Sequence, residues 1–290
     1  MIKISKISKS YGKVTIVDNL SLSIQNGVVF GFLGPNGAGK TTTIKMLVGL
    51  NKPDSGKIEI EKKDPCMPKT REMLGFMPEN PYFYDRLTGL EMLKFCYELC
   101  WSSPTRSGIH KKNKVDSRFH GNDKRNKNNH NYSSRTKDEN SDDSNSPYRI
   151  GKSNDIFNKI LADVGLSDAK NKTIRYYSKG MKQRLGLAQA LVSDPKYLFL
   201  DEPLDGLDPI GRIEVKKIIL DLKKRGKTIF FNSHILADVE EICDQIGIIN
   251  NGRLIYSGNI QKFCKNKPFE AKFVEAIEID NAKFKTQSSK

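Results

Sequence analysis

A glycine-rich stretch at residues 34–42 limits what this 290-residue chain can fold into more than any other feature. In chain order its residues are Gly34, Pro35, Asn36, Gly37, Ala38, Gly39, Lys40, Thr41 and Thr42, which satisfy the phosphate-binding pattern G-x-x-x-x-G-K-[ST] in full. An apolar run at 28–33 precedes the stretch, and a helical pattern of apolar residues follows it. Because the pattern has a physical meaning only between a strand and a helix, this context predicts an α/β fold built around it.

Each residue type in the stretch has a chemical reason to be there. The glycines allow the backbone to curl so that consecutive N–H groups point at phosphate oxygens, and the following helix adds its positive N-terminal dipole. The Lys40 ammonium would reach the β- and γ-phosphates of a nucleotide as a point charge, and the Thr41 hydroxyl would bind Mg²⁺. The stretch therefore predicts that the chain binds the phosphates of a nucleotide.

The composition excludes several other classes of protein. No apolar run approaches the roughly 18 to 20 residues that cross a bilayer, and the first residues lack the apolar core of a signal peptide. The five cysteines include no C-x-x-C pair, so they indicate neither a disulfide framework nor a zinc site. We therefore expect a chain that stays in the cytoplasm.

The formal net charge of +15 has two interpretations. Between residues 101 and 155, 12 Lys and Arg residues stand against 7 Asp and Glu residues, so this segment carries about a third of the excess. The remainder is spread along the chain. It is consistent with a solvated lysine-rich surface, or with attraction to the anionic inner face of a membrane or to RNA.

The N-terminal third of the chain predicts strands and two loop residues that face a ligand. Apolar alternation through the first 30 residues favours a small antiparallel sheet, interrupted by a loop that carries Tyr11. The turn signal at 53–56 leads to a further short strand. Glu79 follows another short apolar strand, which is where α/β proteins place ligand-facing side chains. Thr88, with Glu91 three residues later, predicts a capping box at the start of a helix.

The character of the sequence changes between residues 102 and 154. Asn, Ser, Lys, Arg and Asp dominate this segment, which has too few aliphatic residues to offset its ordering entropy, so we expect a disordered low-complexity insert. Three of the four histidines lie there, but their spacing does not suggest a metal site.

Three candidate functional positions follow the insert. Ser178 is a natural N-cap for a helix that continues to about residue 193. Asp201 and Glu202 end a buried-strand pattern, and a parallel strand ending beside the phosphate-binding stretch would place Asp201 over a Mg²⁺ ion and Glu202 next to the γ-phosphate. A second buried strand ends just before His234, so we expect this histidine at the same edge of the sheet. Residues 245–256 predict a hairpin, and a short polar tail follows.

The order of these motifs resembles that of the ATP-binding subunit of an ABC transporter. The resemblance covers nearly all residues outside 102–154 and the last twenty or so. Its discriminating element begins at Ser178 and is similar to the family signature L-S-G-G-Q. Ser178 and Gly180 are kept, whereas Tyr177 replaces Leu, Lys179 replaces the first Gly and Met181 replaces Gln.

The resemblance implies a phosphate-loop NTPase core, in which helices flank a mostly parallel sheet, with an N-terminal antiparallel β subdomain and a helical subdomain. We expect a single ATPase domain made of 1–101 and 155–265, with the helical subdomain at about 80–101 plus 155–190, the insert at 102–154 and a C-terminal tail at 266–290.

The resemblance also implies a role for each candidate residue. Tyr11 would stack on the adenine ring, Glu202 would polarise the attacking water, and His234 would contact the γ-phosphate. Glu79 occupies the position of a glutamine that senses the γ-phosphate and Mg²⁺, and glutamate there resembles a branch of small-molecule and ion exporters. Ser178 and Gly180 would touch ATP held by the opposite subunit, and Asp208 belongs to a loop that crosses the subunit interface.

The implied assembly consists of two ATP-binding subunits, expected to be a homodimer, and a separate integral membrane permease, with ATP and Mg²⁺ as cofactors. The subunit would lie at the inner face of the cell membrane, and no specific nucleic acid is expected. The main alternative is a soluble ABC ATPase that acts on nucleic acid or ribosomes, favoured by the net charge of +15. A third reading is that the insert leaves a non-functional or regulatory subunit.

The insert itself leads to a prediction. Because the cost of closing a flexible loop grows by only about 0.6 kcal/mol for each doubling of its length, deletion of residues 103–146 should leave folding and ATPase activity nearly unchanged. A steady-state ATPase assay and a thermal melt of the deletion variant test this, and a loss of either property would show that the segment is structural.

Overall fold

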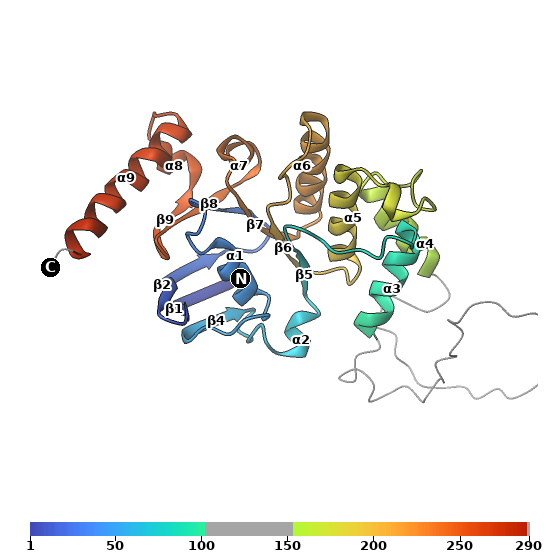
Figure 1. Cartoon of the computed structure of the whole chain (residues 1–290), viewed down its shortest axis with the longest axis horizontal. Coiled ribbons are helices and arrows are strands. Elements are labelled where there is room, and N and C mark those ends of the chain that lie inside the picture. The colour runs from blue at the N-terminus through green and yellow to red at the C-terminus, as the bar shows by residue number, and fades with distance from the viewer. Residues whose placement is uncertain (102–152, 289–290) are drawn as a thin grey trace, which may run out of the picture.

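The computed structural model describes residues 1–101 and 153–288 (Figure 1). Nearly all of the expected insert at 102–154 lies outside the described residues. Its last two residues, 153 and 154, begin helix α4, Ser153–Asp163. Within the described part of the chain, no helix combines the length and the apolar character needed to cross a membrane.

The predicted N-terminal antiparallel sheet is confirmed. Strand β1, Ile2–Tyr11, lies between β2, Val14–Ile24, and β4, Ser55–Ile60, and pairs antiparallel with both. Residues that alternate along β1, such as Ile2 and Ile4, are buried, which is the period expected of a sheet with one covered face.

The main sheet has six strands in the order β5-β6-β7-β3-β8-β9. All neighbours are parallel except β9, which returns antiparallel to β8 in the predicted hairpin. Because parallel strands have their carboxyl ends at one edge, the residues that follow β3, β5, β6 and β7 meet there. The strand bounds are Val29–Leu33 (β3), Leu74–Met77 (β5), Tyr197–Asp201 (β6), Thr228–Ser233 (β7), Gln245–Asn250 (β8) and Arg253–Asn259 (β9).

The two faces of the main sheet are covered by different layers (Figure 1). One face packs against the N-terminal sheet and α1, Lys40–Leu47, through Phe30, Phe32, Tyr197, Phe199 and Phe230. The residues that alternate with these, among them Val29, Leu33, Leu198, Leu200 and Ile229, pack against the helices on the other face. Burial contributes about 1.5–3 kcal/mol for each such side chain, so burial on both faces explains why these strands are continuous apolar runs.

Helices α3, Gly89–Trp101, α4 and α5, Lys179–Leu191, pack together at one end of the molecule. The predicted capping box of α3 is confirmed, because Thr88 N donates to Glu91 Oε2 at 2.8 Å and Glu91 N donates to Thr88 Oγ1 at 3.2 Å. Ser178 is the N-cap of α5, and its Oγ accepts from Met181 N at 3.2 Å. Further described helices are α2, Pro68–Arg71, α6, Pro209–Lys224, α7, Leu236–Ile242, α8, Ile260–Cys264, and a 3₁₀ turn, Ile174–Tyr176.

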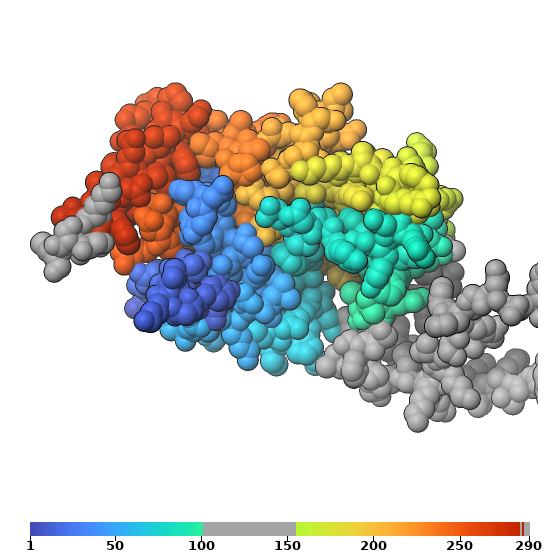
Figure 2. Space-filling model, viewed as in Figure 1, coloured from blue at the N-terminus to red at the C-terminus, as the bar shows by residue number. Residues whose placement is uncertain are grey.

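The C-terminal segment differs from the polar tail expected at 266–290. Residues Phe269–Ser288 form a 20-residue helix, α9. Its first residue, Phe269, is almost fully buried and packs against Phe263 of α8. The space-filling view shows the C-terminal segment (red) beside the N-terminal sheet (blue), at the end of the molecule opposite to α3 and α4 (Figure 2). The polar sequence hid this helix because most of its surface is exposed and only one narrow stripe packs on the core.

Candidate functional site

A cavity of about 460 Å³ lies at the carboxyl edge of the main sheet. It collects residues from the N-terminal sheet, the phosphate-binding loop and the loops after β5, β6 and β7. Its lining consists of Tyr11, Ile16, Asn36, Gly37, Gly39, Lys40, Thr41, Thr42, Glu79, Glu202, Asp205 and His234. Ten of these twelve residues are candidates from the sequence; Ile16 and Asp205 are not.

The phosphate-binding loop connects β3 to α1 in a conformation that only glycine tolerates at several positions. Gly37 and Gly39 have φ angles of 79° and 105°. At Gly34 the reason for glycine is lack of space, because a Cβ there would lie 2.2 Å from the carbonyl oxygen of Ile249 on β8. Gly34, Pro35 and Ala38 shape the loop without lining the cavity. The loop therefore rests directly against the end of strand β8.

Lys40 is buried at the start of α1, where its Nζ donates to the carbonyl oxygens of Gly34 at 2.8 Å and Pro35 at 3.2 Å. Burial lowers the pKa of the Lys40 ammonium, and the negative charges of Glu202, Asp201 and Glu79 oppose that shift. These three carboxylates come from the ends of two different strands. The loop thus holds one buried cation at the centre of an acidic edge, where a polyphosphate and a divalent cation could both bind.

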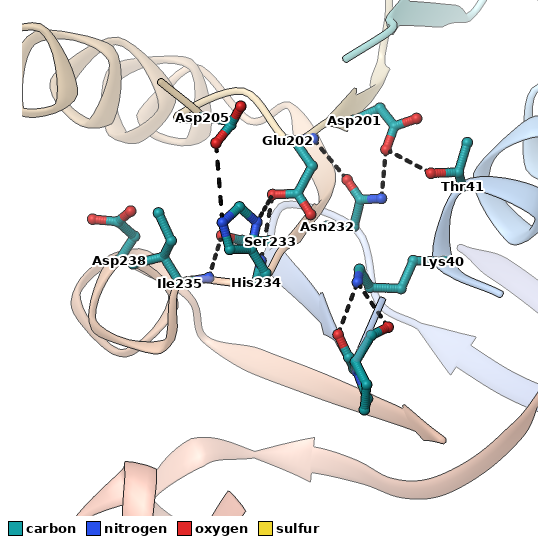
Figure 3. Close-up of polar contacts among 12 residues, drawn as sticks. Lys40, Thr41, Asp201, Glu202, Asp205, Asn232, Ser233, His234, Ile235 and Asp238 are labelled. Atoms are coloured by element: carbon teal, nitrogen blue, oxygen red, sulfur yellow. Dashed lines mark hydrogen bonds and ion pairs between the residues drawn. The ribbon is translucent and has the colours of Figure 1, made fainter. Parts of the chain in front are cut away.

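Thr41 and Asp201 form the oxygen pair expected of a magnesium site. Thr41 Oγ1 donates to Asp201 Oδ1 at 3.3 Å, and Asp201 is buried (Figure 3). A hydroxyl and a carboxylate are hard oxygen donors of the kind that Mg²⁺ prefers, so the residues present fit the ion. Asp201 ends β6, and Thr41 lies on α1, the helix that follows β3. Because β7 lies between β6 and β3, the two side chains meet across the end of β7.

Asn232 organises both acids, and the sequence analysis did not identify it. This buried residue of β7 donates from Nδ2 to Asp201 Oδ1 at 2.5 Å and accepts the Glu202 backbone N–H at 2.8 Å (Figure 3). Glu202 has a φ of 50°, which is uncommon for a residue with a side chain and costs of order 1 kcal/mol. The hydrogen bond from its N–H to Asn232 helps to hold that conformation. A polar residue directly after the apolar run at 229–231 was the only sequence signal.

His234 and Glu202 lie in contact. His234 Nδ1 is 3.0 Å from Glu202 Oε2, and the His234 backbone N–H also donates to that oxygen at 3.3 Å. On the other side of the ring, His234 Nε2 lies 4.0 Å from Asp205 Oδ1. Gln183 of helix α5 donates from Nε2 to the Glu202 carbonyl oxygen at 3.3 Å. Glu202 is therefore held from three directions, by Asn232, His234 and Gln183.

Tyr11 and Glu79 lie at the rim of the cavity. Tyr11 is 50% exposed, and its hydroxyl accepts from Asn51 Nδ2 at 2.9 Å. Lys9 Nζ lies 5.7 Å from the centre of the Tyr11 ring. Glu79 lies two residues after the end of β5 and is part of the cavity lining. An exposed aromatic face at the rim leaves a surface on which a planar base could stack.

Ser178, Gly180 and Asp208 do not line the cavity. Ser178 caps α5, and Asp208 caps α6, where its Oδ1 accepts from Gly211 N at 2.6 Å. Gly180 lies near Leu207, with 3.7 Å between the position of a Cβ and the nearest Leu207 atom. The two helix starts therefore adjoin each other, and none of these three residues belongs to the lining of the chain's own cavity.

Comparison with known proteins points to the same family as the order of the sequence motifs. Residues 17–205 match the family described as ABC transporter. An uncharacterized ABC transporter ATP-binding protein of Synechocystis sp. is 41% identical over 259 residues, which make up 88% of this chain and 59% of that protein. A second such relative, from Nostoc sp., is covered over 62% of its length. The chain therefore spans about six tenths of these two relatives.

Two relatives with more specific names are also similar. The bacitracin transport ATP-binding protein BcrA of Bacillus licheniformis is 38% identical, over 88% of this chain and 68% of that protein. The lantibiotic transport ATP-binding protein SrtF of Streptococcus pyogenes is 33% identical, over 92% of this chain and 97% of that protein.

Solved structures show the same fold. An ATP-binding subunit of an ABC transporter aligns with a TM-score of 0.71 at 22% identity, over 95% of this chain and 99% of that one. A nucleotide-free ATP-binding cassette aligns with a TM-score of 0.72 at 24% identity, over 95% and 98%. The expected fold class, a phosphate-loop core with an N-terminal antiparallel sheet and a helical part, is confirmed.

Proposed function

This chain belongs to the ABC transporter family, and we propose that it is the subunit that binds and hydrolyses ATP to power a separate membrane-spanning permease, in an exporter. The observation that carries the proposal is that Lys40, Thr41, Glu202 and His234 line one cavity. Asp201 lies directly behind this lining, hydrogen-bonded to Thr41.

The phosphate-binding loop would hold the nucleotide. Its backbone N–H groups and Lys40 would neutralise the β- and γ-phosphates, while Tyr11 would stack on the adenine ring. Thr41 and Asp201 would hold Mg²⁺, with Glu79 as a further candidate ligand. When bound, this ion would neutralise charge that develops on the phosphate oxygens.

Glu202 and His234 would position the attacking water. The Glu202 carboxylate would accept a hydrogen bond from the water and orient it in line with the γ-phosphate, and His234 would contact that phosphate. Because Glu202 is already fixed by Asn232 and Gln183, little reorganisation would be needed at the moment of reaction.

Asn232→Ala should lower the kcat of ATP hydrolysis about tenfold. The substitution removes the donor to Asp201 and the acceptor for the Glu202 N–H, so both acids lose their fixed positions. It should also reduce the free energy of unfolding by about 1–3 kcal/mol, since buried polar partners are left unsatisfied. Urea unfolding and steady-state ATPase kinetics measure the two effects separately. A variant that is destabilised but hydrolyses ATP at the normal kcat would show that Asn232 has only a structural role.

A second subunit would complete each site. Ser178 and Gly180 lie away from the chain's own cavity, beside Asp208, so they are free to face ATP bound by another copy. We propose a head-to-tail homodimer that closes on ATP and opens after hydrolysis. In this dimer, residues 1–101 and 155–265 of each copy would form the ATPase domain.

The permease would be a separate protein, and the subunit would lie at the cytoplasmic face of the membrane. The relatives named for bacitracin and lantibiotic transport support an export role. The charge of +15 favours a second candidate, an ABC ATPase that acts on nucleic acid or ribosomes.

Affinity capture of the tagged chain from detergent-solubilised membranes of its host tests the assignment. We expect a polytopic membrane protein to co-purify at both 50 mM and 500 mM salt, together with Mg²⁺-dependent ATPase activity. Capture of RNA that is lost at the higher salt, with no membrane protein, would support the second candidate instead.

A further inference from the structure

Four polar side chains, two from helix α9 and two from the β8–β9 hairpin, connect the helix to the turn of that hairpin. Asn250, the last residue of β8, is 4% exposed, and its Nδ2 donates to Asp280 Oδ2 at 2.8 Å and to Asn281 Oδ1 at 2.9 Å. Asn251 Nδ2 donates to the same Asn281 oxygen at 3.1 Å. Both N–H donors of the buried Asn250 amide are thus used by α9. Without the acceptors on Asp280 and Asn281, this buried amide would lose both of these hydrogen bonds.

The same turn contacts the phosphate-binding loop. Asn251 and Gly252 form its two central residues, with φ angles of 48° and 78° that match the mirror-image turn favoured in two-residue hairpins. Gly252 N donates to the carbonyl oxygen of Ala38 at 3.2 Å, and Gly252 O accepts from Asp18 N at 2.9 Å. One residue before Asn250, the carbonyl oxygen of Ile249 lies against Gly34.

These contacts form one continuous path from α9 to the loop. Asp280 and Asn281 fix Asn250 and the turn. This part of the hairpin contacts the loop at Gly34, through Ile249, and at Ala38, through Gly252. Arg253 adds a lateral attachment, because its Nε donates to Asp18 Oδ2 at 2.8 Å and its guanidinium lies 5.8 Å from the Phe284 ring centre. In Figure 1, α9 lies on the outer side of β9.

We propose that Asp280 and Asn281 of helix α9 are positioning residues for nucleotide binding, which hold the phosphate-binding loop in its binding conformation through the β8–β9 turn. An anion cradle binds well only when its N–H groups are fixed before the ligand arrives, so a loosened turn raises the cost of binding. Neither residue lines the cavity. The inference rests on the proposed function, because it requires that the loop binds a nucleotide.

The Asp280→Ala/Asn281→Ala double variant of the full chain tests the proposal. Alanine favours helix, so α9 itself is not weakened by propensity. We expect the KM for ATP and the dissociation constant of a fluorescent ATP analogue with Mg²⁺ to rise about fivefold or more, while kcat stays within twofold. The Asp280→Asn/Asn281→Asp variant keeps an acceptor oxygen at each position and should restore binding to within twofold of the unaltered chain.

Glu278→Ala is the matched control, because Glu278 is an exposed residue of the same helix, and it should leave binding unchanged. Thermal melts of all variants separate loss of folding from loss of binding at a temperature where each is folded. An unchanged KM in the folded double variant would overturn the proposal, as would a failure of the acceptor-retaining variant to restore binding. If the unaltered chain itself binds no ATP analogue, that result contradicts the proposed function, and the inference about α9 is then overturned as well. If the unaltered chain binds the analogue and only the expected change in the double variant is absent, the inference alone is overturned.

Discussion

Glu202→Gln should lower the kcat of ATP hydrolysis by about 100-fold or more while ATP remains bound. The amide keeps the size of the side chain but can neither accept the proton of the attacking water nor attract it with a negative charge. His234, 3.0 Å from Glu202, and the Asn232 contact to its backbone remain in place, so the site keeps its shape. The measurement is steady-state phosphate release with saturating ATP and Mg²⁺.

The same variant should accumulate as an ATP-bound dimer. Hydrolysis is the step that would reopen the dimer, so a subunit that binds ATP without cleaving it stays closed. Gel filtration with ATP should show a dimer for Glu202→Gln, and a monomer or a mixture for the unaltered chain. Glu240→Gln changes an exposed glutamate of α7 and should behave like the unaltered chain. A normal hydrolysis rate in Glu202→Gln would remove Glu202 from the role of base.

Lys40→Ala should weaken ATP binding by about 100-fold. Hydrogen bonds to charged groups contribute about 1.5–3 kcal/mol, and each 1.4 kcal/mol corresponds to a factor of about ten in the dissociation constant. Lys40 is the buried cation of the loop, placed so that its Nζ already faces the loop interior. Titration of a fluorescent ATP analogue in the presence of Mg²⁺ measures the change.

Lys45→Ala provides the control for this second prediction. Lys45 lies on the same helix, α1, but is exposed, so its removal changes the net charge by the same amount without altering the cavity. Its dissociation constant should stay within twofold of the original. Equal losses in the two variants would mean that overall charge, rather than the position of Lys40, determines binding.

Much of the site could be predicted from the sequence because its signals are local. The loop at 34–42 carries its own glycines and lysine between a strand and a helix. Asp201 and His234 each follow an apolar run too short for a buried helix, so each is identified as the residue at a strand's carboxyl end. In parallel strands, these ends fall at one edge whatever the strand order.

Other parts of the site depend on contacts between distant segments, and the sequence carried little sign of them. Strand β7 lies between β6 and β3. This strand order depends on how the helices and the N-terminal sheet pack on the two faces of the main sheet. Asn232 and Asp205 lie in the site because of that order. An asparagine at the end of an apolar run and an aspartate in a loop have many possible partners, and only the assembled sheet selects one.

The C-terminal helix shows the same division most clearly. By itself, the sequence determined the phosphate-binding loop and the acids that face it, because glycine conformations, strand alternation and helix caps are fixed by neighbouring residues. Tertiary structure alone decided that residues 269–288 are a helix whose Asp280 and Asn281 reach the buried Asn250. A polar helix that is stabilised by docking has no strong local pattern, since the free energy that orders it comes from contacts about 30 residues away.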